Sequence, residues 1–308
     1  MIKLFDPDTY NIDLSDFSNI LHDEIVPEFE KNFCEYVGAK HACSINSATN
    51  AIFLMFLSKG ESVNVPSMIP PVVLNALITS GNRINFTDDV TWIGGSYILH
   101  DFGNYKVIDS AQRVERDQFR KEANPSDLMF FSHYPTKPVG SCDGGMIVSD
   151  DPDKIRWLKE ATMNGMSFSE NNWDRSIKFP GYKMYMNSIQ AFIANENLKK
   201  LDQNKEKLKE IRNYYNSELG IENSSDHLYR IEVKSNREFI QLMAKSDIVC
   251  GIHYAPMHLN PIYTEGQKFN CIDSEKAGSK TVSLPFHPNL DLEDASTVLK
   301  QTKRLWKK

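Results

Sequence analysis

A lysine, an aspartate and several hydroxyl-bearing side chains stand at the ends of apolar segments in this sequence, where they could together hold an anionic cofactor. Asp109 closes the segment "YKVID", Ser132 closes "LMFFS", and residues 47–49, Ser-Ala-Thr, follow "HACSIN". The first turn of a helix has free backbone N–H groups and the positive end of the helix dipole, so residues 47–49 are suited to binding phosphate. Lys137 follows shortly after Ser132.

The stretch "FFSHYPTKPVGSCDGGMIVSD", residues 130–150, shows why Lys137 is singled out. A plain turn is enough to join two buried strands, so a lysine between them needs another reason. Each signal is weak alone, because Ser or Thr at a helix start is usually only a cap and Asp at a strand end is often a turn residue. The order and spacing of these groups together favour a binding site.

Alternating strand and helix patterns predict an α/β domain with a mainly parallel sheet flanked by helices. Residues 26–37 have apolar side chains at helical spacing, and residues 41–60 predict a strand, a turn and a helix. The segments that we expect to be further strands are "ESVNVPS", "NRINFTDD", "SYILHDFG", "YKVIDSA" and "DLMFFSH". Ligands of such sheets bind where strands end and loops begin, so we expect the chemistry there.

A second, smaller α+β domain is expected after a long helix, or two successive helices, that starts at Asn187. We place residues 1–200 in the large domain and residues 201–308 in the small one. In the small domain "HLYRIEV" and "DIVCGIHY" are predicted strands, Ser235 is a predicted helix cap, and a last helix starts at Asp291.

The bulk composition excludes several classes of protein. With 308 residues, a net charge of −6 and a pI near 5.8, the chain favours neither nucleic acid nor an anionic membrane surface as a partner. It has no apolar run near the roughly 18 residues that a membrane span requires, and no apolar signal segment follows Met1. The five cysteines have no CxxC spacing, which predicts a cytoplasmic protein whose cysteines are mostly buried.

The motifs and their order resemble those of the DegT-type nucleotide-sugar aminotransferases, pyridoxal-phosphate enzymes with the aspartate-aminotransferase fold. "PEFEKNFCEYVGAKHACSINSATNAI" is similar to the family's entry segment, "VIDSAQ" to its Asp-x-Ala-Gln, and "FFSHYPTKPVGSCDGG" to its lysine motif. "GYKMYMNSIQAFIANENLKKLD" resembles its bridging helix, and "GIHYAPMHLNPIY" and "SLPFHPNL" resemble its C-terminal landmarks. The likeness covers nearly the whole chain and implies this fold in a trimmed form.

The resemblance implies roles for the residues singled out above. Lys137 would form the Schiff base with the aldehyde of pyridoxal 5'-phosphate and would then carry a proton between the substrate carbon and the cofactor. Asp109 would pair with the pyridine nitrogen and keep it protonated, so that the ring can accept electrons. Gln112 would contact the phenolic oxygen of the ring, as its family counterpart does.

The resemblance also implies a phosphate site that two subunits share. The residues implied in holding the phosphate within one chain are Ser47, Ala48, Thr49, Asn50 and Ser132. Lys183 stands where the family has Asn or Lys reaching the phosphate from the neighbouring subunit, which implies a homodimer with shared active sites.

The family's activity implies an aminotransferase that moves an amino group from L-glutamate onto a keto-sugar carried by a nucleoside diphosphate, for polysaccharide or lipopolysaccharide biosynthesis. His253 and Tyr254 resemble a family motif near the substrate entrance, with a purely structural histidine as an equal alternative. His253 and His258 could suggest a metal, but Pro256 between them argues against the helix that would align two ligands, so we expect no metal.

The sequence departs from the family pattern at several positions. Pro70 in "PSMIPP" stands where an aromatic residue usually stacks on the cofactor ring, so either the cofactor affinity is reduced or another group covers the ring. The segment 88–109 is much shorter than in typical members. We expect both helices around "SYILHDFG" to be lost or reduced to turns, which would change the substrate entrance. Ala48 replaces the glycine of the family's Ser-Gly-Thr, and Tyr185 replaces its usual arginine.

Two other functions stay open at this stage. Related sugar dehydratases replace the lysine by histidine, but Lys137 is intact here and His133 lies four residues too early to take that role. A cofactor-poor homologue that acts as a binding or regulatory protein would explain Pro70 and the shortened segment. The full set of cofactor-facing residues argues against it, because a chain with no cofactor to hold has no physical need for all of them.

Overall fold

The structure of the protein is a computed structural model that describes residues 1–168, 175–264 and 266–306. The helices are α1 (Ile25–Val37), α2 (Ala48–Phe56), α3 (Pro71–Thr79), α4 (Gln118–Glu122), α5 (Pro152–Thr162), α6 (Ser188–Leu219), α7 (Asn236–Ala244), α8 (Ile272–Lys280) and α9 (Leu292–Trp306). The strands are β1 (His41–Ile45), β2 (Ser62–Pro66), β3 (Arg83–Thr87), β4 (Tyr97–Asp101), β5 (Lys106–Asp109), β6 (Leu128–Ser132), β7 (Gly145–Ser149), β8 (Met166–Phe168), β9 (Arg175–Ile177), β10 (Tyr229–Glu232) and β11 (Thr281–Leu284). Short 3-10 helices cover Leu14–Asp16, Met257–Leu259 and Pro261–Tyr263.

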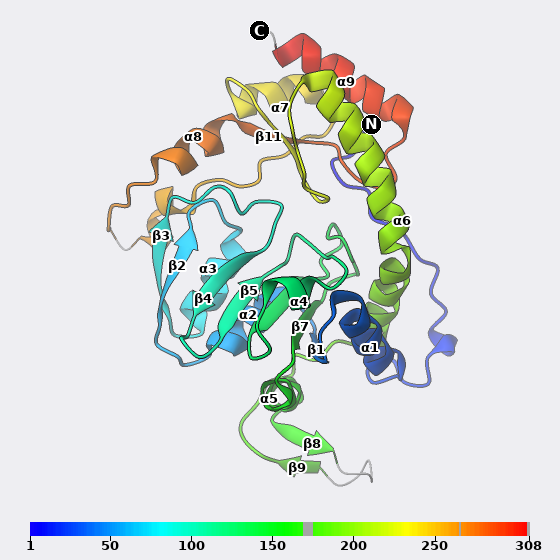
Figure 1. The fold of residues 1–308 in the computed structure, drawn as a ribbon, viewed down its shortest axis with the longest axis vertical. Helices are drawn as coiled ribbons and strands as arrows, with labels where there is room; N and C mark the ends of the chain where they lie inside the picture. The colour runs from blue at the N-terminus through cyan, green and yellow to red at the C-terminus, as the bar shows by residue number, and fades with distance from the viewer. Residues whose placement is uncertain (169–174, 265, 307–308) are drawn as a thin grey trace.

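A five-stranded sheet in the order β1-β7-β6-β5-β4 forms the centre of the large domain (Figure 1). β5 and β6 are parallel, whereas β7 is antiparallel to β1 and β6, and β4 is antiparallel to β5. β2 and β3 form a separate parallel pair. The predicted α/β class with flanking helices is confirmed, but the sheet is mixed and not mainly parallel as expected.

The direction of β4 follows from its short connection to β5. Residues 102–105 link the two strands, and Phe102 N donates to Tyr105 O at 2.9 Å. A parallel crossover needs a dozen or more residues and usually a helix, so this connection allows only a hairpin. No helix lies between β3 and β5, a part of the chain that is described throughout, as the shortened sequence predicted.

Side chains of the buried strands alternate between the two faces of the sheet. Phe130 and Ile147 pack with α2 and α3 on one face, and Phe131 and Val148 pack with α1 and α6 on the other. Helices cover both faces, so the buried strands are apolar at successive positions and not only at alternate ones. The predicted first helix is confirmed as α1.

α6 runs without a break from the large domain into the small one (Figure 1). Asn187 caps its first turn by accepting from Gln190 N at 2.9 Å. The packing changes along the helix, because Leu201 belongs to the core of the large domain and Leu208 packs with β10, β11 and α9. The predicted domain boundary at residue 200 lies close to this change and stays a prediction.

The small domain contains most of the elements expected after α6. "HLYRIEV" contains β10, Ser235 caps α7 by accepting from Glu238 N, and α9 begins directly after Asp291. Asp291 caps α9, since its Oδ1 accepts from Asp294 N at 2.7 Å. These local predictions succeed because caps and apolar spacing are short-range signals.

The strand expected in "DIVCGIHY" is wrong. Ile248 and Gly251 form only isolated bridges, with Ile2 and Ser283 respectively. The neighbouring N-terminal segment and β11 each pair with this stretch at a single residue, so no continuous ladder forms. The pairing nevertheless attaches the N-terminal segment to the small domain. Phe5 comes shortly after the paired residue Ile2.

The cysteines behave as the sequence predicted. Cys34, Cys43, Cys250 and Cys271 are buried, Cys142 is exposed, and all of them are free thiols. Among the described helices, none is both long enough and apolar enough to cross a membrane.

Candidate active site

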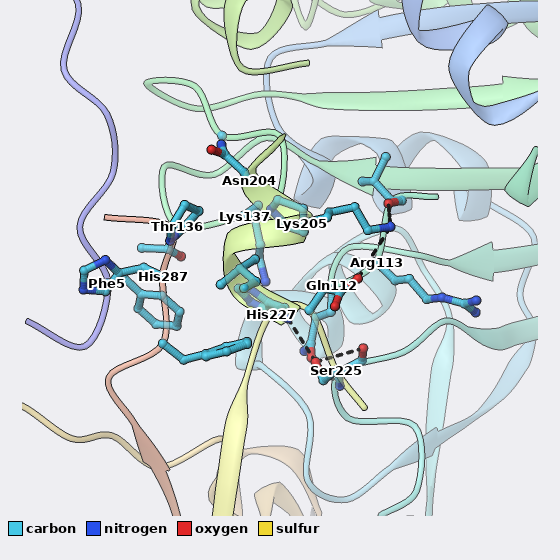
Figure 2. A pocket seen from close by; sticks show the side chains of 18 of the residues that line it. Phe5, Gln112, Arg113, Thr136, Lys137, Asn204, Lys205, Ser225, His227 and His287 are labelled. Atoms are coloured by element: carbon cyan, nitrogen blue, oxygen red, sulfur yellow. Dashed lines mark hydrogen bonds and ion pairs between the residues drawn. The ribbon is translucent and has the colours of Figure 1, made fainter. Parts of the chain in front are cut away.

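Lys137 lines a cavity of about 490 Å³ whose walls come from both domains. The N-terminal segment, the β5–α4 connection, α6 and the small domain all contribute to the lining. Figure 2 shows Lys137 in the middle of the lining residues, with Phe5 and His287 on one side and Gln112 and Arg113 on the other. A cavity between domains, at the ends of sheet strands, is a common place for a small-molecule site.

A tight backbone turn after β6 holds Lys137 in place. Lys137 N donates to Tyr134 O at 2.8 Å. The chain then folds back so closely that a Cβ on Gly140 would lie 2.5 Å from Pro135 O. A side chain does not fit there, which accounts for a small residue in the connection between Lys137 and β7.

Asp109 and Lys137 are a pair of buried titratable groups that influence each other. Burial lowers the pKa of Lys137 to about 8, and the negative charge of Asp109 opposes this shift. Burial raises the pKa of Asp109 to about 6, against the hydrogen bonds from Ala111 N and the Tyr97 hydroxyl and against the charge of Lys137. Groups perturbed in this way by burial and by a specific partner mark candidate functional sites.

The predicted phosphate-binding groups meet at the ends of three strands. Ser132 pairs with Gly145 in the register of β6 and β7. A Cβ on Gly145 would lie 2.8 Å from Ala48 N, so the start of α2 rests directly on this glycine. None of residues 47–50, Ser132 and Gly145 is among the residues that line the cavity around Lys137, and we call them the phosphate end of the site.

The first turn of α2 presents free backbone donors at the phosphate end. Ser47 caps the helix by accepting from Asn50 N at 3.2 Å. The N–H groups of Ala48 and Thr49 have no acceptor within the described part of the chain. Two free donors at a helix start can bind an anion.

Gln112 lies at the cavity wall with both ends of its amide engaged. Gly94 N donates to Gln112 Oε1 at 2.7 Å, and Gln112 Nε2 donates to the Tyr254 hydroxyl at 2.8 Å. The backbone donor at Gly94 therefore fixes which end of the amide carries the N–H groups. We call Asp109, Gln112 and their partners Tyr97, Gly94 and Tyr254 the ring end of the site.

His253 and Tyr254, which the sequence predicts near the substrate entrance, both lie at the site. His253 Nδ1 is hydrogen-bonded with Ser283 Oγ at 2.8 Å. Burial lowers the pKa of His253 to about 4, and the charges of Lys137 and Arg230 add to the shift. His253 is therefore a neutral imidazole with a structural partner, and its contact with substrate stays a prediction.

Three residues of the site were not identified from the sequence. Burial lowers the pKa of His227 well below its ordinary value, with Lys137 and His253 adding to the shift. The ring of Phe5 stacks on His227 with a centroid distance of 5.5 Å, and Tyr97 bonds the aspartate at the ring end. The position of His227 at the start of a predicted strand was a usable signal, whereas no local pattern points to Phe5 or Tyr97.

Lys183 is not brought to the cavity of its own chain. It forms an isolated bridge with Met163 and does not line the cavity around Lys137. It lies near His22, whose pKa is lowered by burial and then by the charges of Arg175 and Lys183. Its predicted contact with a phosphate in a neighbouring subunit stays a prediction.

The histidines of the "HxxxxH" pair have separate partners. His258 lies in hydrogen-bond contact with Ser67 Oγ at 2.5 Å and Glu275 Oε1 at 3.3 Å, whereas His253 bonds Ser283. Among the residues that the structure describes, no group of three or more His, Cys, Asp or Glu side chains is arranged to hold a metal ion.

A model of the DegT/DnrJ/EryC1/StrS aminotransferase family matches the chain over residues 10–89 and 107–303. The chain belongs to this family. The expected enzyme class, an aminotransferase, is thereby confirmed. The match leaves residues 90–106 of this DegT-family chain uncovered, and these residues contain β4 and most of the loop before it.

Relatives and solved structures agree with this membership. The UDP-4-amino-4,6-dideoxy-N-acetyl-beta-L-altrosamine transaminase of Campylobacter jejuni is 27% identical over 354 aligned residues, covering 94% of each chain. The spore coat polysaccharide biosynthesis protein SpsC of Bacillus subtilis is 26% identical, covering 92% of this chain and 90% of SpsC. Helicobacter pylori PseC, an aminotransferase involved in the biosynthesis of pseudoaminic acid, superimposes with a TM-score of 0.83 at 19% identity over 99% of both chains. The aminotransferase TlmJ from Streptoalloteichus hindustanus gives a TM-score of 0.84 at 21% identity, over 99% of this chain and 98% of TlmJ. The expected fold is confirmed.

The structure shows the surroundings of Pro70 and Tyr185, two positions at which this DegT-family chain departs from the family pattern. Pro70 is the N-terminal cap residue of α3, and Pro71 follows as the first residue of that helix. The ring of Tyr185 lies 4.5 Å from that of His22, and its backbone forms an isolated bridge with Ile45. Neither position disturbs the sheet.

The residues present fit pyridoxal phosphate, the cofactor of this family. Lys137 offers a buried amine, Asp109 offers a buried carboxylate that interacts with it, and the start of α2 offers free N–H groups. Gly145 leaves open the space that a Cβ would take beside Ala48 N. The donor set therefore matches an aldehyde, a ring nitrogen and a phosphate.

Proposed function

We propose that the protein is a pyridoxal-phosphate-dependent aminotransferase that transfers the amino group of L-glutamate to a keto-sugar carried by a nucleoside diphosphate. The observation that carries this proposal is Lys137, a buried amine in a cavity between the domains, with a pKa lowered to about 8 and Asp109 nearby. The acceptor class is supported by the relatives, since the Campylobacter protein is named as a UDP-sugar transaminase. A role in polysaccharide biosynthesis is supported by the name of the Bacillus relative.

Lys137 has two roles in this proposal. When bound, pyridoxal phosphate supplies an aldehyde that carries the amino group and a ring that accepts electrons from the substrate carbon. Lys137 would hold the cofactor at its aldehyde carbon and, once free, would move a proton to and from the substrate carbon. The lowered pKa suits both roles, because only the free amine is a nucleophile and a base.

Asp109 and the phosphate end would hold the two ends of the cofactor. A carboxylate is favoured in its charged form beside a protonated nitrogen, which offsets the burial that raises the pKa of Asp109 to about 6. The free N–H groups of α2 and the Ser132 hydroxyl would bind the phosphate.

His133 favours transamination over the dehydratase alternative. Its Nδ1 is hydrogen-bonded with Val139 O at 2.7 Å, and its ring packs edge-on against Phe29 and Phe33 at 5.2 and 5.5 Å. It lies in the core on the α1 side of the sheet and does not line the cavity. Lys137 is the better candidate for proton transfer at the cofactor.

A homodimer in which Lys183 of each chain reaches the phosphate end of the other completes the proposal. Lys183 lies outside its own cavity, and the β8–β9 hairpin projects from the large domain below α5 (Figure 1). Ile177 in this hairpin is 74% exposed. An ammonium group binds phosphate as a point charge, so a lysine can act from a partner chain without a fixed orientation. The molar mass of the full chain in solution, measured by light scattering, tests this assembly.

Substitution of Lys137 tests the proposed reaction. The parent protein loaded with pyridoxal phosphate is expected to convert L-glutamate to 2-oxoglutarate in an amount equal to its sites, and Lys137→Ala is expected to form none. Lys40→Ala is the matched control, because Lys40 is an exposed lysine paired with Asp150 at the surface. Circular dichroism checks that both variants fold. Full activity in a folded Lys137→Ala protein would refute the assignment.

A further inference from the structure

The segment from Thr91 to Tyr97, which ends in the first residue of β4, makes contacts at the site and lies outside the family match. It lies wholly within the residues 90–106 that the family match leaves uncovered. Two of its residues, Gly94 and Tyr97, nevertheless bond the side chains at the ring end.

Tyr97 lies directly opposite Asp109 in the β4–β5 register. Its hydroxyl donates to Asp109 Oδ2 at 3.1 Å, and Ala111 N donates to Asp109 Oδ1 at 2.9 Å. Each carboxylate oxygen therefore has one donor, which fixes the orientation of the group and favours its charged form. The contact depends on the hairpin, since the antiparallel turn brings Asp109, at the end of β5, back beside Tyr97, at the start of β4.

Gly94 connects the same loop to Gln112 and to the small domain. Gly94 N donates to Gln112 Oε1 at 2.7 Å, and the Ser225 hydroxyl donates to Gly94 O at 3.3 Å. Gly94 has a φ of 89°, and a Cβ there would lie 2.6 Å from Ser225 Oγ, so only glycine fits. The loop is thus tied to both domains.

Aromatic rings pack around these hydrogen bonds. The ring of Trp92 lies 4.8 Å from that of Tyr97 and 6.1 Å from that of Tyr254, and it is parallel to the ring of Tyr254 within 4°. Trp92 is 6% exposed and Asp109 is 5% exposed. A hydrogen bond shielded from water in this way is stronger and better fixed than one at the surface.

We infer that Tyr97 is a positioning residue for the cofactor ring: it holds the Asp109 carboxylate against the ring nitrogen, in a loop whose Gly94 holds Gln112 toward the phenolic oxygen. The inference rests on the proposed function, because it takes Asp109 to face the nitrogen of pyridoxal phosphate. The hydrogen bond from Tyr97 also lowers the pKa of Asp109, against the burial that raises it to about 6. Without Tyr97, more of Asp109 would be protonated and unable to keep the nitrogen charged.

Cofactor binding by the full-length protein, freed of cofactor, tests this role. Tyr97→Phe removes the hydroxyl and keeps the ring, so the aromatic packing stays in place. It is expected to weaken the affinity for pyridoxal 5'-phosphate about tenfold, as the loss of one hydrogen bond to a charged group does. Quenching of tryptophan fluorescence on titration measures the dissociation constant.

A ring analogue separates positioning from general packing. In 1-deazapyridoxal 5'-phosphate a carbon replaces the ring nitrogen, so Asp109 has no basic atom to hold. If Tyr97 acts through Asp109, Tyr97→Phe changes the affinity for this analogue by less than about twofold. An equal loss of affinity for both ligands would assign a packing role to Tyr97 and overturn the inference. Unchanged affinity for pyridoxal phosphate would overturn it as well.

Tyr105→Phe is the matched control variant. Tyr105 lies at the other end of the same hairpin, where its ring stacks on Phe102 with a centroid distance of 4.8 Å. This variant is expected to bind both ligands as the parent protein does. Reduction with borohydride and peptide mass analysis then locate the cofactor in the parent protein. Absence of cofactor from Lys137 would overturn the proposed function, whereas a loaded Lys137 with no effect of Tyr97→Phe would overturn this inference alone.

Discussion

The two ends of the candidate active site are built in different ways. At the phosphate end, the start of α2 rests on Gly145, and Gly145 pairs with Ser132, so backbone and small groups of neighbouring elements make the site. At the ring end, Asp109 and Gln112 are held by β4, by the loop before it and by the small domain. The phosphate end is therefore built mainly from the local backbone, whereas the ring end is assembled from side chains that are far apart in the sequence.

This difference indicates which contacts of the site can be replaced by others when the sequence changes. Both ends of the site contain residues that the family match covers, but the partners Gly94 and Tyr97 lie in its uncovered stretch. A phosphate cradle made of backbone N–H groups tolerates little change, because those groups are fixed by the helix that carries them. A carboxylate can be held by any donor that arrives in the right place, so a shortened connection can supply a new one.

Asp109→Asn is expected to cause the largest loss among changes at the two ends. The amide cannot keep the ring nitrogen protonated, so the rate of 2-oxoglutarate formation from L-glutamate should fall by about 100-fold or more. Asp101→Asn is the control, because Asp101 is an exposed acid at the far end of β4. A rate for Asp109→Asn within about twofold of the parent would mean that the nitrogen has another partner, and the contrast between the two ends would fail.

Gly145→Ala is expected to have a smaller effect, confined to the phosphate end. The added Cβ would lie 2.8 Å from Ala48 N, which is backbone and cannot move aside as a flexible side chain can. Overpacking of this kind costs about 1–3 kcal/mol, so the affinity for pyridoxal phosphate should fall about 30-fold. Equilibrium dialysis measures this affinity.

Pyridoxal without the phosphate group is the chemical control for Gly145→Ala. Its affinity should be the same for the variant and the parent protein, because it makes no contact at the phosphate end. A similar loss for both ligands would show that the glycine supports the whole cavity, and the two ends would then not be separable.

The phosphate end and Lys137 could be predicted from the sequence because their signals are short-range. A strand followed by Ser-Ala-Thr at a helix start, and a lysine between two apolar strands, appear within a few positions of one another. Glycine at residue 145 has a physical reason that the structure supplies, since a Cβ there would press on the start of α2. The roles of these residues at a cofactor stay predictions until they are tested.

The ring end could be predicted only in part. Asp109 and Gln112 follow from the motif "VIDSAQ", but their partners Tyr97 and Gly94 do not, because the contacts depend on the direction of β4. The sequence indicated a shortened segment without indicating that it would turn β4 antiparallel. For the same reason the expected mainly parallel sheet is wrong, since strand direction depends on connection length and on pairing between segments that local patterns do not describe.

The pH dependence of cofactor attachment to Lys137 is the smallest expected effect, and it tests which end controls the lysine. Because burial lowers the pKa of Lys137 to about 8, the free amine becomes the main form above that pH. The rate of attachment should therefore rise about tenfold between about pH 7 and pH 9 and then level off, as followed by absorbance in rapid mixing.

The charge of Asp109 raises this pKa, so Asp109→Asn should move the midpoint to lower pH, whereas Gly145→Ala should leave it unchanged. A rate that still rises steeply above about pH 9 would mean that Lys137 titrates as an ordinary lysine. A midpoint that moves with Gly145→Ala and not with Asp109→Asn would reverse the assignment of the two ends.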